Sequence, residues 1–187
     1  MSIAVLSDIH GNFEAFQVCV QYALERGIKT FIFLGDYLGE FAFPQRTMEF
    51  IYQLKDSYEC IFIKGNKEDY WLNYRKFGEC GWKEYDSTTG SLYYSYNNLT
   101  DKDLEFYSSM DSMKELRFGD MEPIMICHGS PRKVNAYGQI FLKYSGKKRM
   151  KVILEKKIYK AMIACIIPRK NHFQYAWSRK KYMIVLG

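Results

Sequence analysis

The feature that most constrains the fold is a repeated order of short apolar segment, polar cluster and helical pattern. Apolar segments at Ile3–Ser7, Thr30–Leu34 and Cys60–Ile63 predict three buried strands. Asn12, in the cluster after the first strand, is a residue type that caps helices, and Pro44 can begin a second helix. Strands that alternate with helices predict an α/β fold, in which helices cover a largely buried sheet.

The second half of the chain is less regular but also predicts helices and strands. Thr100 can cap a helix that runs through Met110, and a hairpin can follow at Met113–Phe118 and Pro123–Cys127. The later segments predict one helix and three strands, at about Lys147–Lys160, Ala161–Ile167, His172–Trp177 and Tyr182–Leu186. Neither an internal repeat nor a low-complexity linker is visible, so we predict a single domain over residues 1–187.

Composition and charge exclude several classes of protein. With 48% hydrophobic and 17% aromatic residues the chain is not disordered, and no apolar run approaches the roughly 20 residues needed to cross a membrane. The net charge of +6 is uneven, because residues 1–142 carry −6 and residues 143–187 carry +12. The five cysteines include no C-x-x-C pair and no secretory signal is visible, which favours the reducing cytoplasm.

Polar side chains that can bind metal ions follow the predicted strands. Asp8, His10, Asp36, Asn66 and His128 stand directly after four of these strands. In α/β sheets, ligands bind at the carboxyl ends of the strands. Carboxylate, amide and imidazole groups together suit Mn, Fe or Zn better than Ca, and the two oxygens of Asp36 can bridge two ions.

Four motifs occur in a fixed order, Asp8-Ile9-His10, Gly35-Asp36-Tyr37-Leu38-Gly39, Gly65-Asn66 and His128-Gly129-Ser130-Pro131. In this order and spacing they resemble the calcineurin-like metallophosphoesterase superfamily, and within it the small bacterial and archaeal phosphodiesterase-type branch. The resemblance covers Met1 to about Gln139, and the family pattern decays over residues 143–187. It implies a two-sheet α/β sandwich with α-β-β-α layers and two divalent metal ions where the sheets meet.

The resemblance also implies how the two metal ions are held. Asp8, His10 and Asp36 would bind the first ion, and Asp36, Asn66 and His128 would bind the second. Manganese is the expected metal, with iron, zinc or nickel as alternatives. By the same resemblance, Asn66 and His128 also take part in catalysis.

The sequence departs from the family pattern at two places. Lys67 stands where many relatives have a catalytic His, and it can either steady a phosphate as a point charge or be a solvated surface residue. Later, the family's Gly-His-x-His is missing, because Ile166-Ile167-Pro168-Arg169 follows the strand Ala161–Cys165. His172 is a candidate substitute ligand. A natural degenerate copy, a frame error and a truncated or altered chain all account for this loss.

Two main hypotheses for function follow. The first is metal-dependent hydrolysis of a phosphodiester or small phosphomonoester by metal-bound hydroxide, with a phosphorylated small molecule or nucleotide as substrate. The alternative is a catalytically impaired binding protein on the same fold. Specific nucleic-acid binding by the basic tail is disfavoured, because Lys at this density on a helix usually forms a solvated face, and Tyr93, Tyr94 and Tyr96 are expected to pack rather than stack on bases. No membrane partner is expected, and a homo-oligomer is compatible with the sequence.

Overall fold

The computed structural model describes residues 2–78, 81–87, 89–117 and 123–129 and the backbone of five later strands. The described residues form five helices, α1 (Phe13–Glu25), α2 (Pro44–Ser57), α3 (Asn66–Phe77), α4 (Gly90–Asn97) and α5 (Asp101–Ser108). The earlier strands are β1 (Ile3–Ser7), β2 (Thr30–Phe33), β3 (Glu59–Phe62), β4 (Met113–Leu116) and β5 (Ile124–Cys127). The later strands are β6 (Gln139–Phe141), β7 (Lys151–Ile153), β8 (Met162–Ile166), β9 (Phe173–Ser178) and β10 (Lys181–Leu186).

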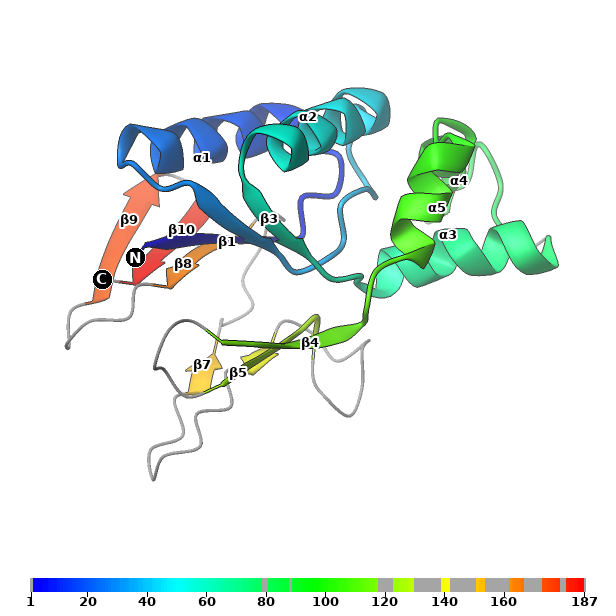
Figure 1. Cartoon of the computed structure of the whole chain (residues 1–187). Helices are drawn as coiled ribbons and strands as arrows, with labels where there is room; N and C mark the ends of the chain where they lie inside the picture. Colours follow the sequence, from blue (N-terminus) through cyan, green and yellow to red (C-terminus); the bar gives the residue numbers. More distant parts are fainter. Residues whose placement is uncertain are drawn as a thin grey trace.

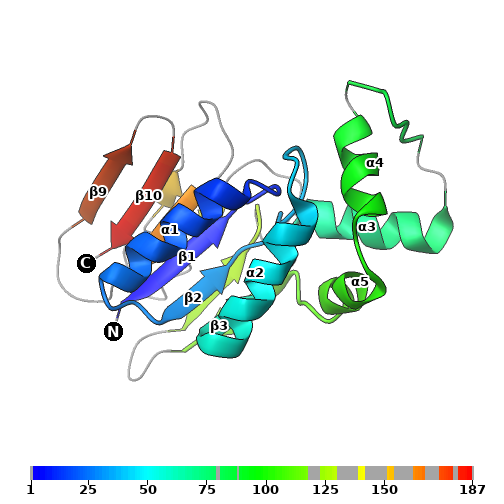
Figure 2. The same ribbon diagram turned by 90° about the horizontal axis from the view of Figure 1, so that it is seen from above.

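Six of these strands form a central sheet in the order β3-β2-β1-β8-β10-β9. The strands β1, β2 and β3 are parallel, whereas β8 runs antiparallel to β1. Helices α1 and α2 cover one face of this sheet and the antiparallel β4-β5 hairpin lies on the other side (Figure 1). Helices α3, α4 and α5 group to one side of α2 (Figure 2). A further two-stranded sheet is formed by β6 and β7, and the predicted α/β fold class is confirmed.

The helix ends follow from local chemistry in the sequence. The Asn12 side chain accepts a hydrogen bond from the amide of Ala15 at 3.2 Å and thereby caps α1. The chain leaves α1 at Gly27, whose φ of +72° is accessible to glycine at little cost. Thr100 and Asp103 form a reciprocal capping box at the start of α5, with the Thr100 amide 2.7 Å from the Asp103 carboxylate. The helix starts predicted at Asn12 and Thr100 are confirmed, and α5 ends at Ser108, two residues before the predicted Met110.

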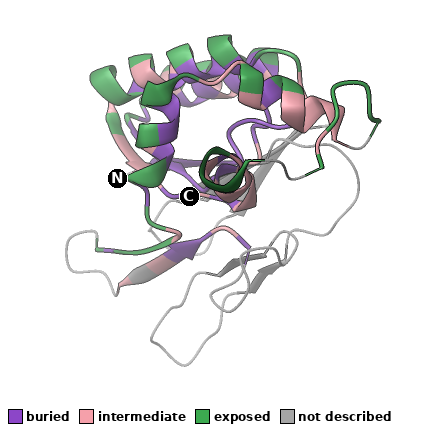
Figure 3. Ribbon diagram, turned by 90° about the vertical axis from the view of Figure 1, so that its right-hand side faces the viewer, coloured by how far each residue is buried: buried purple, intermediate pink, exposed green. Residues whose placement is uncertain are grey.

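The hydrophobic core lies between the central sheet and its helices, with exposed residues on the outer helix surfaces (Figure 3). An aromatic cluster joins α3 to α4. The rings of Tyr74 and Trp82 stack with their centroids 4.7 Å apart, and Tyr96 meets Tyr74 edge-on at a centroid distance of 4.4 Å. The expectation of packing is therefore confirmed for Tyr96, whereas Tyr94, which was also expected to pack, is 46% exposed. None of the described helices is long and apolar enough to cross a membrane.

One prediction for the later chain is wrong. The helix expected over about Lys147–Lys160 is interrupted by β7, which pairs antiparallel with β6 so that Ile140 faces Val152. β-Branched residues such as Val152 and Ile153 pack well in a sheet, and the available partner strand outweighs the helical pattern. The rest of that predicted helix lies outside the described residues. The three strands predicted after it are confirmed as β8, β9 and β10.

Candidate metal centre

The polar residues that follow β1 and β2 lie on two loops that run side by side. The amides of Asp8, His10 and Gly11 donate hydrogen bonds to the successive carbonyls of residues 35–37, at 3.1, 2.9 and 2.8 Å. These bonds continue the parallel pairing of β1 with β2 beyond the ends of the strands. Each buried amide therefore has a defined partner, and the two loops are fixed relative to each other.

Three candidate ligands have unusual backbone conformations. Asp8, His10 and Asp36 have φ values of 56°, 54° and 56°, in the left-handed region that residues other than glycine seldom adopt. Such a conformation costs about 1–3 kcal/mol per residue and persists where the surrounding structure enforces it. The hydrogen bonds between the two loops hold these strained conformations, and the conformations in turn set the directions of the three side chains.

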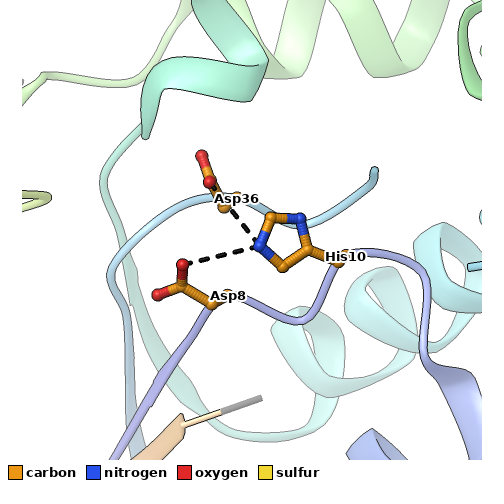
Figure 4. Close-up of side chains that lie close together, drawn as sticks. All are labelled: Asp8, His10 and Asp36. Carbon is orange, nitrogen blue, oxygen red and sulfur yellow. Dashed lines mark ion pairs between the residues drawn. The ribbon is translucent and has the colours of Figure 1, made fainter. Parts of the chain in front are cut away.

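The first half of the centre consists of Asp8, His10 and one oxygen of Asp36. His10 Nε2 lies 3.5 Å from Asp8 Oδ1 and 3.8 Å from Asp36 Oδ2, and all three side chains point toward one another (Figure 4). One ligand atom from each residue lies within 4.8 Å of the others. His10 and Asp36 are buried, whereas the Asp8 side chain remains 38% exposed and gives access from solvent.

The second half of the centre consists of Asn66, His128 and the other oxygen of Asp36. Asn66 is the first residue of α3, and His128 follows β5 directly. His128 Nε2 lies 3.2 Å from Asn66 Oδ1 and 3.6 Å from Asp36 Oδ1. On its other side, His128 Nδ1 lies 2.8 Å from the backbone carbonyl of Leu34, which leaves Nε2 directed toward Asn66 and Asp36.

Several carboxylates lie close together in the centre, and their charges shift the pKa values of its side chains. Burial raises the pKa of Asp36, and although His128 opposes this effect, the charge of Asp8 adds to it. Burial alone would lower the pKa of His10, but Asp8 and Glu40 outweigh it and raise the pKa to about 9. In the metal-free protein, protons therefore occupy positions that a divalent cation can take.

Glu68 ties the Asp36 loop to the start of α3. Its fully buried carboxylate accepts hydrogen bonds from the amides of Asp36 at 2.8 Å, Tyr37 at 2.9 Å and Gly65 at 2.7 Å. Burial and the nearby Asp36 carboxylate raise the pKa of Glu68 to about 7, while the three amides favour its charged form. One side chain thus joins the loops that carry Asp36 and Asn66.

Two glycines make room for the candidate ligands. A Cβ atom at Gly39 would lie 2.5 Å from His10 Nδ1. A Cβ atom at Gly65 would collide with the Asp36 carboxylate and lie 2.9 Å from His128 Nδ1. A side chain at either position therefore displaces a histidine or an aspartate of the centre, and only glycine fits without rearrangement.

Lys67 is not a solvated surface residue. Its side chain is only 13% exposed, and its Nζ lies 3.2 Å from Glu40 Oε1. Its backbone amide donates to Asp36 Oδ1 at 3.0 Å. The Lys67 ammonium therefore lies at the edge of the centre, next to the loop that carries Asp36, where a positive charge can meet an anion.

The residues present fit a pair of divalent cations. Two carboxylates, two imidazoles and an amide oxygen are ligand types that suit manganese, iron or zinc. The late histidines of the family have no described counterpart. Strand β8 ends at Ile166, which pairs with Ile3 at the start of β1, whereas Asp8 follows the other end of β1. His172 lies outside the described residues.

Comparison with known proteins identifies the family of the chain. The model of the calcineurin-like phosphoesterase family matches residues 1–161. The chain belongs to this family, as the four ordered motifs predicted. Metal-dependent hydrolysis of phosphate esters, with divalent metal ions as cofactor, is the general chemistry of this family.

Individual relatives match smaller parts. The uncharacterized protein MJ0912 of Methanocaldococcus jannaschii is 39% identical over 66 residues, which are 35% of this chain and 26% of that protein. Among solved structures, the hypothetical protein PH1004 from Pyrococcus horikoshii OT3 has a TM-score of 0.58 and 22% identity, over 71% of this chain and 56% of its own. A metallophosphoesterase from Sphaerobacter thermophilus has a TM-score of 0.49 and 23% identity, over 72% of this chain and 49% of its own. The chain thus spans about a quarter to a half of these relatives.

Two residues of the centre were missed by sequence reasoning. Glu68 stands three residues after Gly65, the cap of α3, and this capping-box spacing is a signal that identifies it. Glu40 carries no such signal. Its carboxylate reaches His10 and Lys67 only because the loop after β2 folds back over the centre.

Proposed function

We propose that this chain hydrolyses phosphate esters at a two-metal centre, with Asp8, His10 and Asp36 holding one ion and Asp36, Asn66 and His128 holding the other. The observation that carries the proposal is the position of Asp36. Its Oδ2 faces His10 and its Oδ1 faces His128, so that one carboxylate serves both halves. Paired divalent ions neutralise phosphate charge and lower the pKa of a coordinated water.

The chain's own residues supply orientation and charge in this proposal. The strained loops direct Asp8, His10 and Asp36 inward, and Leu34 keeps His128 Nε2 directed toward Asn66 and Asp36. Lys67 would hold a non-bridging phosphate oxygen as a point charge, in the position where many relatives have a histidine. The partly exposed Asp8 leaves the centre open on one side for a substrate.

We further propose a phosphodiester or a small phosphomonoester, including a nucleotide, as the substrate and manganese as the preferred metal. Carboxylate and imidazole ligands suit manganese, with iron, zinc and nickel as alternatives. A cytoplasmic location is proposed because the five cysteines are an odd number, widely spaced and without a C-x-x-C pair, a pattern typical of a reducing compartment.

A catalytically impaired binding protein remains the second candidate. It is favoured by the missing Gly-His-x-His, since each ion would keep three protein ligands and have more positions open to water. Weakly held ions would lower catalytic activity while a phosphorylated ligand could still bind at the loops.

Hydrolysis of a chromogenic phosphodiester and of a chromogenic phosphomonoester with added Mn²⁺ distinguishes the two candidates. The wild-type chain should hydrolyse at least one of them, and Asp36→Ala should not, because it loses the shared ligand of both ions. Equal rates for the two proteins would contradict hydrolysis at this centre. Two bound metal ions per wild-type chain, measured by elemental analysis, would count against the impaired binding protein.

A further inference from the structure

Glu40 connects two groups of the centre that are far apart in the sequence. Its Oε2 lies 2.8 Å from His10 Nδ1 and its Oε1 lies 3.2 Å from Lys67 Nζ. Each oxygen of the carboxylate thus meets a different partner.

The loop that carries Glu40 is held in place from outside the centre. The Ser95 hydroxyl of α4 donates to the carbonyl of Gly39 at 2.9 Å, directly before Glu40. The Tyr94 hydroxyl reaches the carbonyl of Ala42 at 3.4 Å, two residues after it. On the inner side, the amide of Phe41 donates to the carbonyl of His10 at 3.0 Å. Helix α4 therefore fixes the loop on both sides of Glu40.

We propose that Glu40 is a positioning residue that orients His10 toward the first metal ion and holds Lys67 at the edge of the centre. This inference rests on the proposed two-metal centre. Metal-binding histidines usually place their second ring nitrogen against a carboxylate, a carbonyl or water, which sets the tautomer and increases ligand basicity. With the Glu40 carboxylate at Nδ1, the Nε2 atom of His10 is left for the ion between Asp8 and Asp36.

The same carboxylate restrains Lys67. A free lysine side chain samples many rotamers, and fixing one of them costs conformational entropy at the moment a ligand binds. The ion pair with Glu40 already orders the Lys67 side chain before a ligand binds, because it holds the ammonium beside the Asp36 loop. Glu40 thus couples the affinity of the centre for metal to its affinity for phosphate.

Calorimetric titration of the metal-free full-length chain with Mn²⁺ tests the first role. Glu40→Ala should weaken the binding of one ion by about 10–100-fold, the usual effect of removing such a partner. Glu40→Gln should lie between Ala and wild type, because its amide oxygen can still face Nδ1 but lacks the charge. The matched control is Glu14→Gln, which removes a carboxylate from an exposed ion pair with Arg46. Wild-type Mn²⁺ affinity in Glu40→Ala would overturn the inference while leaving the proposed function intact.

Affinity for inorganic phosphate at saturating Mn²⁺ tests the second role. Glu40→Gln and Lys67→Met should each weaken phosphate binding, and the double variant should bind phosphate no worse than Lys67→Met alone. Additive losses would show that Glu40 does not act through Lys67 and would overturn this role. A wild-type chain that binds Mn²⁺ but hydrolyses no ester would refute the proposed function. The effects of Glu40 on Mn²⁺ affinity and on phosphate affinity could still be measured. Far-UV circular dichroism of Glu40→Gln checks that its fold is retained.

Discussion

The two halves of the candidate metal centre orient their histidines in different ways. His10 has its Nδ1 atom against the side-chain carboxylate of Glu40, whereas His128 has its Nδ1 atom against the backbone carbonyl of Leu34. A backbone carbonyl at a strand end is fixed by the sheet and survives any substitution of its side chain. A carboxylate on a loop can be removed or altered by one mutation. The first half is therefore adjustable through the sequence, and the second half is set by the fold.

The backbone shows the same contrast. Asp8 and His10 of the first half, together with the shared Asp36, have left-handed φ values, whereas Asn66 begins a regular helix and His128 follows a strand without positive φ. The first half thus depends on enforced local strain and the second on the ends of regular elements. A substitution can therefore disturb one half alone, or the Glu68 side chain that joins them.

Among substitutions that act on one half alone, the largest effect is expected from removing its histidine. His10→Ala and His128→Ala should each lower the hydrolysis of a responsive ester by about 10²–10³-fold, comparable to the loss of one group that stabilises developing charge. Each variant should also bind one Mn²⁺ fewer per chain by elemental analysis. Gln17→Ala, at an exposed position of α1, is the control. Loss of both ions from only one of the two variants would break the picture of two separable halves.

Glu68→Ala should destabilise the fold, because this carboxylate joins the two halves. It leaves three buried amides without their acceptor, and we expect a loss of about 3–5 kcal/mol in the free energy of unfolding. Urea denaturation of the metal-free chain measures this change. Glu49→Ala, at an exposed position in α2, should change stability by no more than about 0.5 kcal/mol. Similar midpoints for the two variants would contradict the linking role of Glu68.

The affinity of the first half for Mn²⁺ should increase with pH. The pKa of His10, raised to about 9, means that the metal-free protein carries a proton that the ion must displace. Apparent affinity should rise up to about tenfold per pH unit below that value and then level off. The same shift stabilises the metal-free fold fully below pH 6.5, and that contribution is lost as the pH rises to about 9. Titration calorimetry in buffers of different ionisation enthalpy should report about one proton released, and no release would refute the prediction.

The smallest effect is expected from Lys67→Met, which keeps the length of the side chain but removes its charge. Affinity for inorganic phosphate should fall about tenfold, as expected for one hydrogen bond to a charged group, while the number of bound Mn²⁺ ions stays unchanged. Competition between phosphate and the ester during hydrolysis measures this affinity. Lys55→Met, on α2 beside the ring of Phe106, serves as the control for loss of a lysine. Unchanged inhibition by phosphate in Lys67→Met would show that Lys67 does not bind phosphate.

The sequence was most informative where position along a strand decides position in space. Asp8 and Asp36 are far apart in the chain, yet they follow neighbouring parallel strands of one sheet, and they were expected to meet for that reason. The contact of Asp36 with His128, which follows a strand of another sheet, was expected from the family resemblance. Glu40 could not be found in this way, because its contacts depend on how α4 holds a loop. The strand β7 was missed because its pairing with β6, rather than its own pattern, decides its conformation.

The hydrogen bonds between the loops after β1 and β2 have a further consequence for the cost of binding. Because the amides of Asp8, His10 and Gly11 are already bonded to the neighbouring loop, the backbone around the ligands is ordered before any ion arrives. Little conformational entropy then remains to be lost on binding, which favours affinity. These amides should exchange with deuterium as slowly in the metal-free chain as the amides inside β1, and metal should slow them little further.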